Sequence, residues 1–395
     1  MQLKAATAFI VRTPPPHWGG YYWYFVRLET DSGLVGWGEC AVLFGMYGLE
    51  RTFTHWVSEA FERYLAGRDP LNREVLTKTL YAGLCSQHPD YFAAGVISAF
   101  DIAMWDICGK HLGVPVCDLM GGRYRTRMRS YTYIYDVEGG DLASSAASWS
   151  QNPKRVGELA ARLVDEGFTG VKLDPLRYLP PGMGPLAPLE ITMAEYDRAE
   201  RTIEAIRRAV GERADILIGT HGQMTPSVSR RLARRLEPYD PLWLEEPCPP
   251  ENFEEMGAIA ASTSIPIATG ERLAFAHDFQ KLFAARACAY AQPDLGSCGG
   301  FTAAKAIASM AEAHYVLMAP HVWGGPIITA AAMQLDAAIP NFLIQESIYK
   351  SGAFFDTILG APIKWEAGDL ILEERPGIGA ELDPDKMAPF LVAAG

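Results

Sequence analysis

In the first part of the chain, apolar and polar residues alternate at first, and further on the apolar residues recur at helical spacing. Within residues 3–40, short aromatic and β-branched runs alternate between apolar and polar positions, and Asp31-Ser32-Gly33 separates two of them. Alternation on both sides of such a turn predicts a β-hairpin. Apolar positions then recur at helical spacing, most clearly over 93–111, where Gly113 ends the pattern. Strands followed by helices predict an α+β unit over residues 1–125.

The rest of the chain repeats a short apolar run that is followed, in most cases, by a helical stretch. Parallel strands joined by helical crossovers produce this alternation, and eight such units close into a (β/α)8 barrel. The eight runs are SYTYIY (130–135), GVKLD (170–174), ILIGTHG (216–222), PLWLEEP (241–247), PIATGE (266–271), AYAQPDL (289–295), VLMAPH (316–321) and FLIQES (342–347). A doubly wound open sheet is the weaker alternative, because no GxGxxG turn follows an early strand.

Composition narrows the class of protein. The 395 residues are 49% hydrophobic and 21% charged, which excludes a disordered chain, and the length favours two domains. The net charge of −12 argues against nucleic acid and anionic membranes as partners. We find no signal-peptide pattern, no CxxC pair among 7 cysteines and no apolar run of about 18 residues. These features predict a cytoplasmic protein with reduced thiols and no membrane-spanning helix.

Ionisable side chains gather at the ends of the predicted barrel strands. Active sites of such barrels lie at the carboxyl ends of the strands. One charged residue there often only caps a helix, but seven of the eight runs end in this way, and buried charges are costly unless they are paired or bound to metal. The residues are Lys172, Asp174, His221, Glu245, Glu246, Glu271, Asp294, His321 and Glu346. Together they predict an active site.

Two carboxylates on consecutive strands, Glu245 and Glu271, indicate a cation. Neighbouring strands bring them close together, and clustered carboxylates repel each other unless a cation neutralises them. Oxygen ligands with open positions suit Mg²⁺. Lys172 lies on a neighbouring part of the barrel and is a candidate general base or electrophile.

The histidines point to proton transfer. Asp294 and His321 end adjacent strands, and a carboxylate bonded to one imidazole nitrogen fixes the tautomer and leaves the other nitrogen as a base. His221 ends a strand on the other side of the barrel mouth and could meet the opposite face of a bound ligand.

The ordered motifs GVKLD, GTHG, LEEP, TGE, QPDLGSCGG and APH, with GWGEC (36–40) near the start, resemble the mandelate racemase and muconate-lactonizing branch of the enolase superfamily. The resemblance implies an α+β capping domain over 1–125, a modified (β/α)7β barrel over 126–358, and a segment 359–395 that returns to the cap. It also implies Mg²⁺-assisted removal of the proton α to a substrate carboxylate, giving an enediolate, in a homo-oligomer that is an octamer or a smaller even assembly.

Within that branch the chain is most similar to acid-sugar dehydratases of the galactonate and mannonate type. Their resemblance implies that His221 protonates the leaving hydroxide, that Glu346 contacts the substrate, and that the loop 175–190 belongs to the same pattern. The implied enzyme is a lyase that removes the 3-hydroxyl of a sugar acid as water and gives a 2-keto-3-deoxy acid. An epimerase, racemase or cycloisomerase using the same enediolate is the alternative, as is a catalytically altered sugar-acid binding homologue.

One position departs from the family. Its first metal ligand is the aspartate of a DxH run, and this chain has Gly219-Thr220-His221. Water could fill the position, Asp174 or His221 could move in, or ordinary metal-dependent catalysis could be lost. The intact remainder of the site favours a retained but altered site. Asp174 also stands where racemases of the branch carry a second lysine, which favours one-base elimination over two-base racemisation.

Other residues are placed against the substrate. The resemblance implies that His17 and Trp18 lie on a mobile loop of the cap that closes over the substrate, although an ordinary aromatic strand start fits equally well. Arg272 could reach a substrate carboxylate or form a salt bridge within the barrel. Trp323 precedes two glycines whose backbone amides could approach an anion. Asp174 is also expected to contact the substrate.

Overall fold

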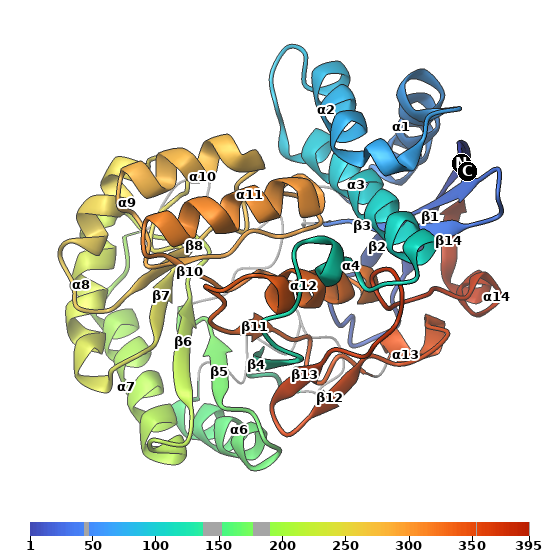
Figure 1. The fold of residues 1–395 in the computed structure, drawn as a ribbon. Coiled ribbons are helices and arrows are strands. Elements are labelled where there is room, and N and C mark those ends of the chain that lie inside the picture. The colour runs from blue at the N-terminus through green and yellow to red at the C-terminus, as the bar shows by residue number, and fades with distance from the viewer. Residues whose placement is uncertain (43–46, 137–151, 177–189, 353, 395) are drawn as a thin grey trace.

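The computed structural model consists of a cap and a barrel (Figure 1), and it describes residues 1–395 except 43–46, 137–151, 177–189, 353 and 395. The cap is built on an antiparallel sheet of order β14-β1-β2-β3, in which the predicted hairpin joins β2 to β3. Its strands are β1 (Leu3–Arg12), β2 (Tyr22–Thr30), β3 (Val35–Cys40) and β14 (Leu391–Ala394). Its helices are α1 (Glu50–Ala60), α2 (Arg73–Leu84), α3 (Tyr91–Leu112) and α4 (Val116–Leu119).

Helix α3 is the central element of the cap. The side chain of Asp90 accepts from the Ala93 amide at its start, and Gly113, with φ 71°, ends it in the left-handed region. Among the described residues, α3 is one helix that is long and apolar enough to cross a bilayer by length and composition alone, although charged residues interrupt it. Within the most apolar 18 residues of this helix, 94% of the window is buried inside the protein, as in the core helix of a folded domain.

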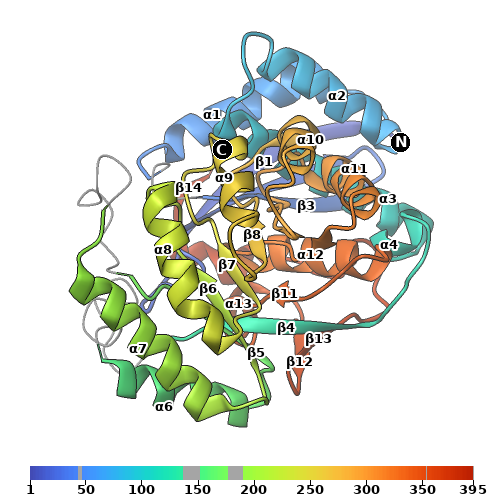
Figure 2. The same ribbon diagram turned by 90° about the vertical axis from the view of Figure 1, so that its left-hand side faces the viewer.

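Eight parallel strands among the described residues form the barrel (Figure 2), and the predicted strands are all present. Seven pair in the order β10-β9-β8-β7-β6-β5-β4; β11 pairs with β4, and a bridge from Met318 to Phe342 closes the ring. The strands are β4 (Arg127–Tyr133), β5 (Gly170–Leu173), β6 (Asp215–Gly219), β7 (Trp243–Glu245), β8 (Ile267–Thr269), β9 (Tyr290–Ala291), β10 (Leu317–Met318) and β11 (Gln345–Glu346).

A helix follows each of the strands β4–β10 in the described part of the chain, which gives the (β/α)7β arrangement. These helices surround the strands (Figure 1) and bury an apolar face against them, as Val228, Leu232 and Leu236 of α8 do. They are α6 (Pro153–Asp165), α7 (Met193–Val210), α8 (Pro226–Leu236), α9 (Phe253–Ala260), α10 (Phe275–Ala284), α11 (Gly300–Ala313) and α12 (Pro326–Ala338).

The interior of the barrel is packed with side chains, so it is not a channel. Tyr131, Leu217 and Trp243 are fully buried there, and the rings of Tyr131 and Trp243 meet edge to face with centroids 5.3 Å apart. This layer fills the barrel below the carboxyl ends of the strands. In the described structure, no channel therefore runs through the barrel past this layer.

The C-terminal segment contacts the barrel before it reaches the cap. A hairpin of β12 (Lys364–Glu366) and β13 (Asp369–Ile371) pairs antiparallel with the first residues of β4. The chain then bridges to Pro115 at Gly377, and β14 adds to the cap sheet beside β1. The boundaries at 125/126 and 358/359 stay predictions. All 7 cysteines are free, and only Cys288 is not fully buried.

The cap is attached to the barrel by buried carboxylates. Asp101 of α3 accepts from the amide and the hydroxyl of Thr302 on α11, at 3.0 and 2.6 Å. Glu39 of β3 accepts from the backbone amides of Gly325, Ile327 and Ile328, at the start of α12. Burial raises the pKa of Glu39 to about 8, although the hydrogen bonds from these amides lower it. The loop between β10 and α12 is therefore hydrogen-bonded to the cap at its α12 end.

We expect Gly38→Ala to destabilise the protein. A Cβ at Gly38 would lie 1.8 Å from the carbonyl oxygen of Ala99, so β3 and α3 would have to separate. Overpacking of this kind costs about 1–3 kcal/mol of the free energy of unfolding, which denaturant unfolding measures. The matched control is Gly360→Ala, where the nearest atom to the added Cβ is 3.5 Å away. Equal stability of the two variants would contradict the close packing of β3 on α3.

Candidate active site

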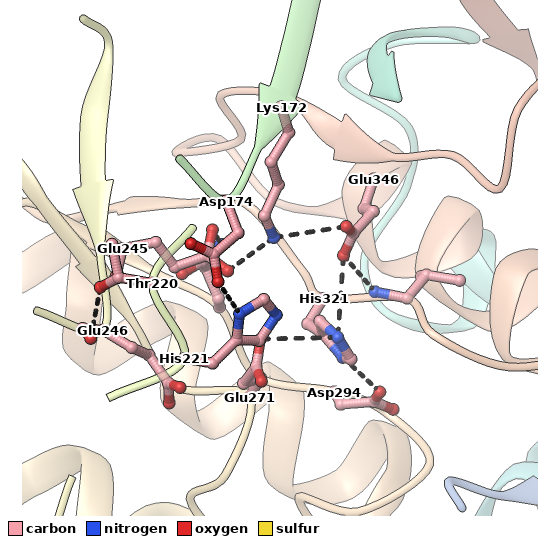
Figure 3. A network of polar contacts seen from close by, with 12 residues as sticks. Lys172, Asp174, Thr220, His221, Glu245, Glu246, Glu271, Asp294, His321 and Glu346 are labelled. Carbon is pink, nitrogen blue, oxygen red and sulfur yellow. Dashed lines mark hydrogen bonds and ion pairs between the residues drawn. The ribbon is translucent and has the colours of Figure 1, made fainter. Parts of the chain in front are cut away.

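The residues predicted from the strand ends meet at the carboxyl end of the barrel (Figure 3). They come from seven strands, β5 to β11, or from the turns directly after them, so parallel pairing brings together positions that are far apart in the sequence. The figure shows Lys172, Asp174, His221, Glu245, Glu246, Glu271, Asp294, His321 and Glu346 around one space.

Lys172 is the cation at the centre of the cluster. Its Nζ lies 2.5 Å from Glu245 Oε1 and 3.4 Å from Glu346 Oε1, and its side chain is 1% exposed. Burial by itself lowers the pKa of Lys172, but the charges of Glu245 and Glu346 outweigh burial and raise the pKa well above its usual value. In this arrangement the ammonium form is favoured, and it can act as an electrostatic group.

His321 is oriented by Asp294. His321 Nδ1 lies 2.7 Å from Asp294 Oδ2. Because an ionised carboxylate only accepts, Nδ1 carries the proton and Nε2 faces the cavity, 3.6 Å from Glu271 Oε2. Burial lowers the pKa of His321, but the charge of Glu271 and the hydrogen bond to Asp294 outweigh burial and raise it to about 10. The imidazole is thus a stronger base than an ordinary histidine, and it must lose its resting proton before it accepts another.

His221 forms a second pair with Asp174. His221 Nδ1 lies 3.2 Å from Asp174 Oδ2, and Gln223 Nε2 donates to the same oxygen at 2.6 Å. Desolvation lowers the pKa of His221, but the hydrogen bond to Asp174 and the charge of Glu271 raise it to about 9, so this imidazole is protonated at neutral pH. Asp174 thus holds a histidine of the site, and its contact with the substrate stays a prediction.

The two histidine–aspartate pairs lie on opposite sides of the barrel. His221 follows β6 and His321 follows β10, and these strands are four places apart in the ring of eight described strands. Lys172 on β5 and Glu346 on β11 lie on the arc between them. A small ligand in this space would have one imidazole on each side and an ammonium between them.

Arg272 forms the salt bridge within the barrel that was the alternative to substrate binding. Its Nη2 lies 2.7 Å from Glu246 Oε2, and its Nε donates to Glu246 Oε1 at 3.1 Å. Glu246 is 1% exposed, and burial raises its pKa to about 7 against the charge of Arg272. Arg272 Nη2 makes no hydrogen bond among the described residues, so the guanidinium is held by one hydrogen bond and by the charge of Glu246.

The predicted cap residues lie at the rim of the barrel. Trp18 stacks on Tyr349 with ring centroids 5.8 Å apart and meets Tyr135 edge to face at 4.8 Å. These two tyrosines follow β11 and β4, so Trp18 bridges two barrel loops. His17 instead bonds Thr13 of its own loop through Nδ1 at 3.0 Å. Trp323 lies beside Gly20, whose added Cβ would be 3.4 Å from the indole nitrogen. In the predicted loop 175–190, residues 177–189 lie outside the described part.

Known proteins resemble this chain over almost its whole length. The family model described as the mandelate racemase/muconate lactonizing enzyme N-terminal domain matches residues 22–121, and the one described as enolase C-terminal domain-like matches 155–386. Proteins named D-galactonate dehydratase from Variovorax paradoxus and Ralstonia nicotianae are 34% and 35% identical, covering 92% and 91% of this chain and 90% and 89% of theirs.

Solved structures agree with this match. A mandelate racemase/muconate lactonizing enzyme structure from Labrenzia alexandrii superposes with a TM-score of 0.92 at 40% identity, covering 99% of this chain and 97% of its own. One from Burkholderia has the same TM-score at 42% identity, covering 99% and 94%. The chain belongs to the mandelate racemase/muconate lactonizing enzyme branch of the enolase superfamily. The resemblance on which the expected fold was based is therefore confirmed.

The residues of this family member do not fit an ordinary three-carboxylate metal site. Glu245 and Glu271 are present, but a Cβ added to Gly219 would lie 2.8 Å from Lys172 Cε and 2.9 Å from Tyr133 Oη. Asp174 and His221, which could complete the site, bond each other in this structure, and their part in metal binding stays a prediction. No group of three or more metal-ligating side chains occurs among the described residues. The donor set is thus incomplete for Mg²⁺, which stays an expectation from the family resemblance.

Sequence reasoning missed three polar residues of the site. Tyr133 ends the first barrel strand, which was the one end without a charged residue. Gln292 donates to Glu245 Oε2 at 2.8 Å, and Glu39 reaches the start of α12 from the cap. A rule that counted charged strand ends could not find a phenol or an amide. The alternation of side chains along a strand would have placed Gln292 on the same face as Asp294.

We expect Arg272→Met to destabilise the protein because it leaves the buried Glu246 carboxylate without its cation. Breaking a buried pair costs about 3–5 kcal/mol, and the 31% exposure of Arg272 lowers our expectation to roughly 1–3 kcal/mol. Denaturant unfolding of Arg272→Met, Glu246→Gln and the double variant measures the coupling. The free energy of unfolding should fall by less in the double variant than the sum of its decreases in the two single variants. Wild-type stability of Arg272→Met would instead favour the substrate-binding role.

Proposed function

We propose that the protein is a sugar-acid dehydratase that removes the proton α to a carboxylate and then eliminates the 3-hydroxyl as water. The observation that carries the proposal is the pair of histidine–aspartate units, His321–Asp294 and His221–Asp174, on opposite sides of a buried ammonium. Two relatives that cover at least nine tenths of this chain are named D-galactonate dehydratase, which supports the same reaction class.

The proposed reaction needs one base and one acid. After His321 has lost its resting Nε2 proton to solvent, Nε2 accepts the C2 proton, and the electron pair of the C2–H bond is delocalised into the carboxylate as an enediolate. The Lys172 ammonium lies close enough to the cluster to stabilise the developing negative charge, and such preorganised charge is usually a large contribution. His221 then donates its proton to the departing C3 hydroxyl, which leaves as water. The resulting enol tautomerises to the 2-keto-3-deoxy acid.

The arrangement also favours a second candidate, epimerisation at C2, because two imidazoles flank the same space. An epimerase would return a proton to C2 and lose no water, so the product separates the candidates. A sugar-acid binding homologue without turnover is motivated by Gly219 alone. The cytoplasmic location, the even-numbered homo-oligomer and the lack of nucleic-acid or membrane partners stay predictions from the sequence.

The proposal is tested by a screen of sugar acids that includes D-galactonate. Formation of a 2-keto-3-deoxy acid, measured with semicarbazide, is the expected result. A product that keeps all its oxygen atoms would favour the epimerase, and binding without any turnover would favour the binding homologue.

We expect His321→Asn to abolish exchange of the C2 proton of the substrate in deuterated water, because asparagine cannot accept that proton. Loss of a positioned base lowers the rate by about 10²–10⁴-fold. Proton NMR of the substrate measures the exchange. The control is His314→Asn, an exposed histidine on the outside of the barrel, which should exchange like the wild type. Normal exchange in His321→Asn would remove this residue from the role of base.

We expect His221→Asn to stop elimination while C2 exchange continues. Asparagine cannot protonate the leaving hydroxide, so keto-acid formation should fall by about 10²–10⁴-fold. His321 and its partner Asp294 are unchanged in this variant, so deuterium should still enter C2 at a comparable rate. If elimination survived as well, His221 would not be the acid.

A further inference from the structure

The space that a side chain at position 219 would occupy is filled by two other residues. A Cβ there would lie 2.8 Å from Lys172 Cε, 2.9 Å from Tyr133 Oη and 3.7 Å from Glu245 Oε1. The absence of a side chain at Gly219 is therefore what lets the Lys172 stem pass and bring its ammonium to Glu245. An aspartate at this position and Lys172 in its present conformation exclude each other.

The carboxylates of the cluster already have protein partners. Glu245 accepts from Lys172 at 2.5 Å on one oxygen and from Gln292 at 2.8 Å on the other. Glu346 accepts from Lys172 and from the backbone amide of Val322 at 3.0 Å. Glu271 faces His321 Nε2 at 3.6 Å. Glu245 and Glu346 thus each have a positive and a donating neighbour within the protein.

Tyr133 supplies an unused donor at the same place. Its hydroxyl is buried and has no hydrogen-bond partner among the described residues, and Lys172 Nζ lies 5.2 Å from the centre of its ring. A buried hydroxyl without a partner is unfavourable, and a ligand oxygen next to it would satisfy it. The ring also stacks over His221 at 6.5 Å, which places the hydroxyl within the proposed site.

We propose that Lys172 and Tyr133 together replace the divalent cation in this protein: the ammonium and the phenol hydroxyl bind the substrate carboxylate and stabilise the enediolate, and the site works without Mg²⁺. The claim that these two residues stabilise the enediolate rests on the proposed function. The claim that the site binds no divalent cation does not depend on it. Lys172 supplies a fixed positive charge and Tyr133 a hydrogen bond. Neither residue gains or loses a proton in the reaction, so the proton balance between His321 and His221 is unchanged.

The metal part is tested by titrating the protein with Mn²⁺ in a calorimeter, with no substrate present. We expect no saturable binding to the wild type at millimolar Mn²⁺ and clear binding to Gly219→Asp, in which the added carboxylate displaces the flexible end of Lys172. Gly219→Asn is the matched control, because it has the same shape without the charge, and it should not gain binding. Tight Mn²⁺ binding by the wild type would overturn the proposal.

The catalytic part is tested with a sugar acid that the wild type converts. Prolonged dialysis against EDTA should leave kcat/KM within about twofold, and added Mg²⁺ should not raise it. Tyr133→Phe should lower kcat/KM by about 10–100-fold, the loss expected for a hydrogen bond to a charged group. Tyr131→Phe is the control, because its hydroxyl is also buried and unpaired but lies in the packed interior of the barrel, and it should leave kcat/KM unchanged.

The outcomes separate the two proposals. Turnover that requires Mg²⁺ would overturn the metal-free site and leave the dehydratase intact. Equal activity of Tyr133→Phe and Tyr131→Phe would remove Tyr133 from the site. If no sugar acid is converted, the proposed dehydratase fails, and the Mn²⁺ titration of Gly219→Asp against the wild type still decides whether Lys172 has replaced the cation.

Discussion

The ion pair between Lys172 and Glu245 is the interaction on which the arrangement of the site depends. Both side chains are 1% exposed, and two such charges are stable in the interior only when each partner satisfies the other. Gly219 makes the pair possible because it leaves room for the Lys172 stem. The glycine at this strand end therefore decides which side chain supplies positive charge next to Glu245.

The proton-transfer groups follow from the barrel more than from any local motif. Parallel strands place their carboxyl ends on one side, and a ring of eight puts the ends of β6 and β10 across from each other. Each histidine is then fixed by an aspartate from a neighbouring strand end, Asp174 for His221 and Asp294 for His321. The packed interior below them prevents a ligand from entering deeper and keeps it between the two imidazoles.

The cap completes the site from outside the barrel. Glu39 holds the start of α12, so the loop after His321 is positioned by a residue of the first domain. Trp18 reaches across to Tyr349 and Tyr135 on two barrel loops. The loop that follows the proposed base and the aromatic contacts of Trp18 thus belong to the same interface between the two domains.

The sequence alone determined the barrel, its eight strands, the cap and most of the charged residues at the mouth, because periodicity and charged strand ends are local signals that the fold preserves. It also identified Gly219 as unusual. Only the tertiary structure decided what fills that position, since Lys172 and Tyr133 reach it from β5 and β4. The pairing of Asp174 with His221 and of Arg272 with Glu246 was likewise set in three dimensions. Partner choice among buried charges depends on distances between strands, and a linear pattern does not contain those distances.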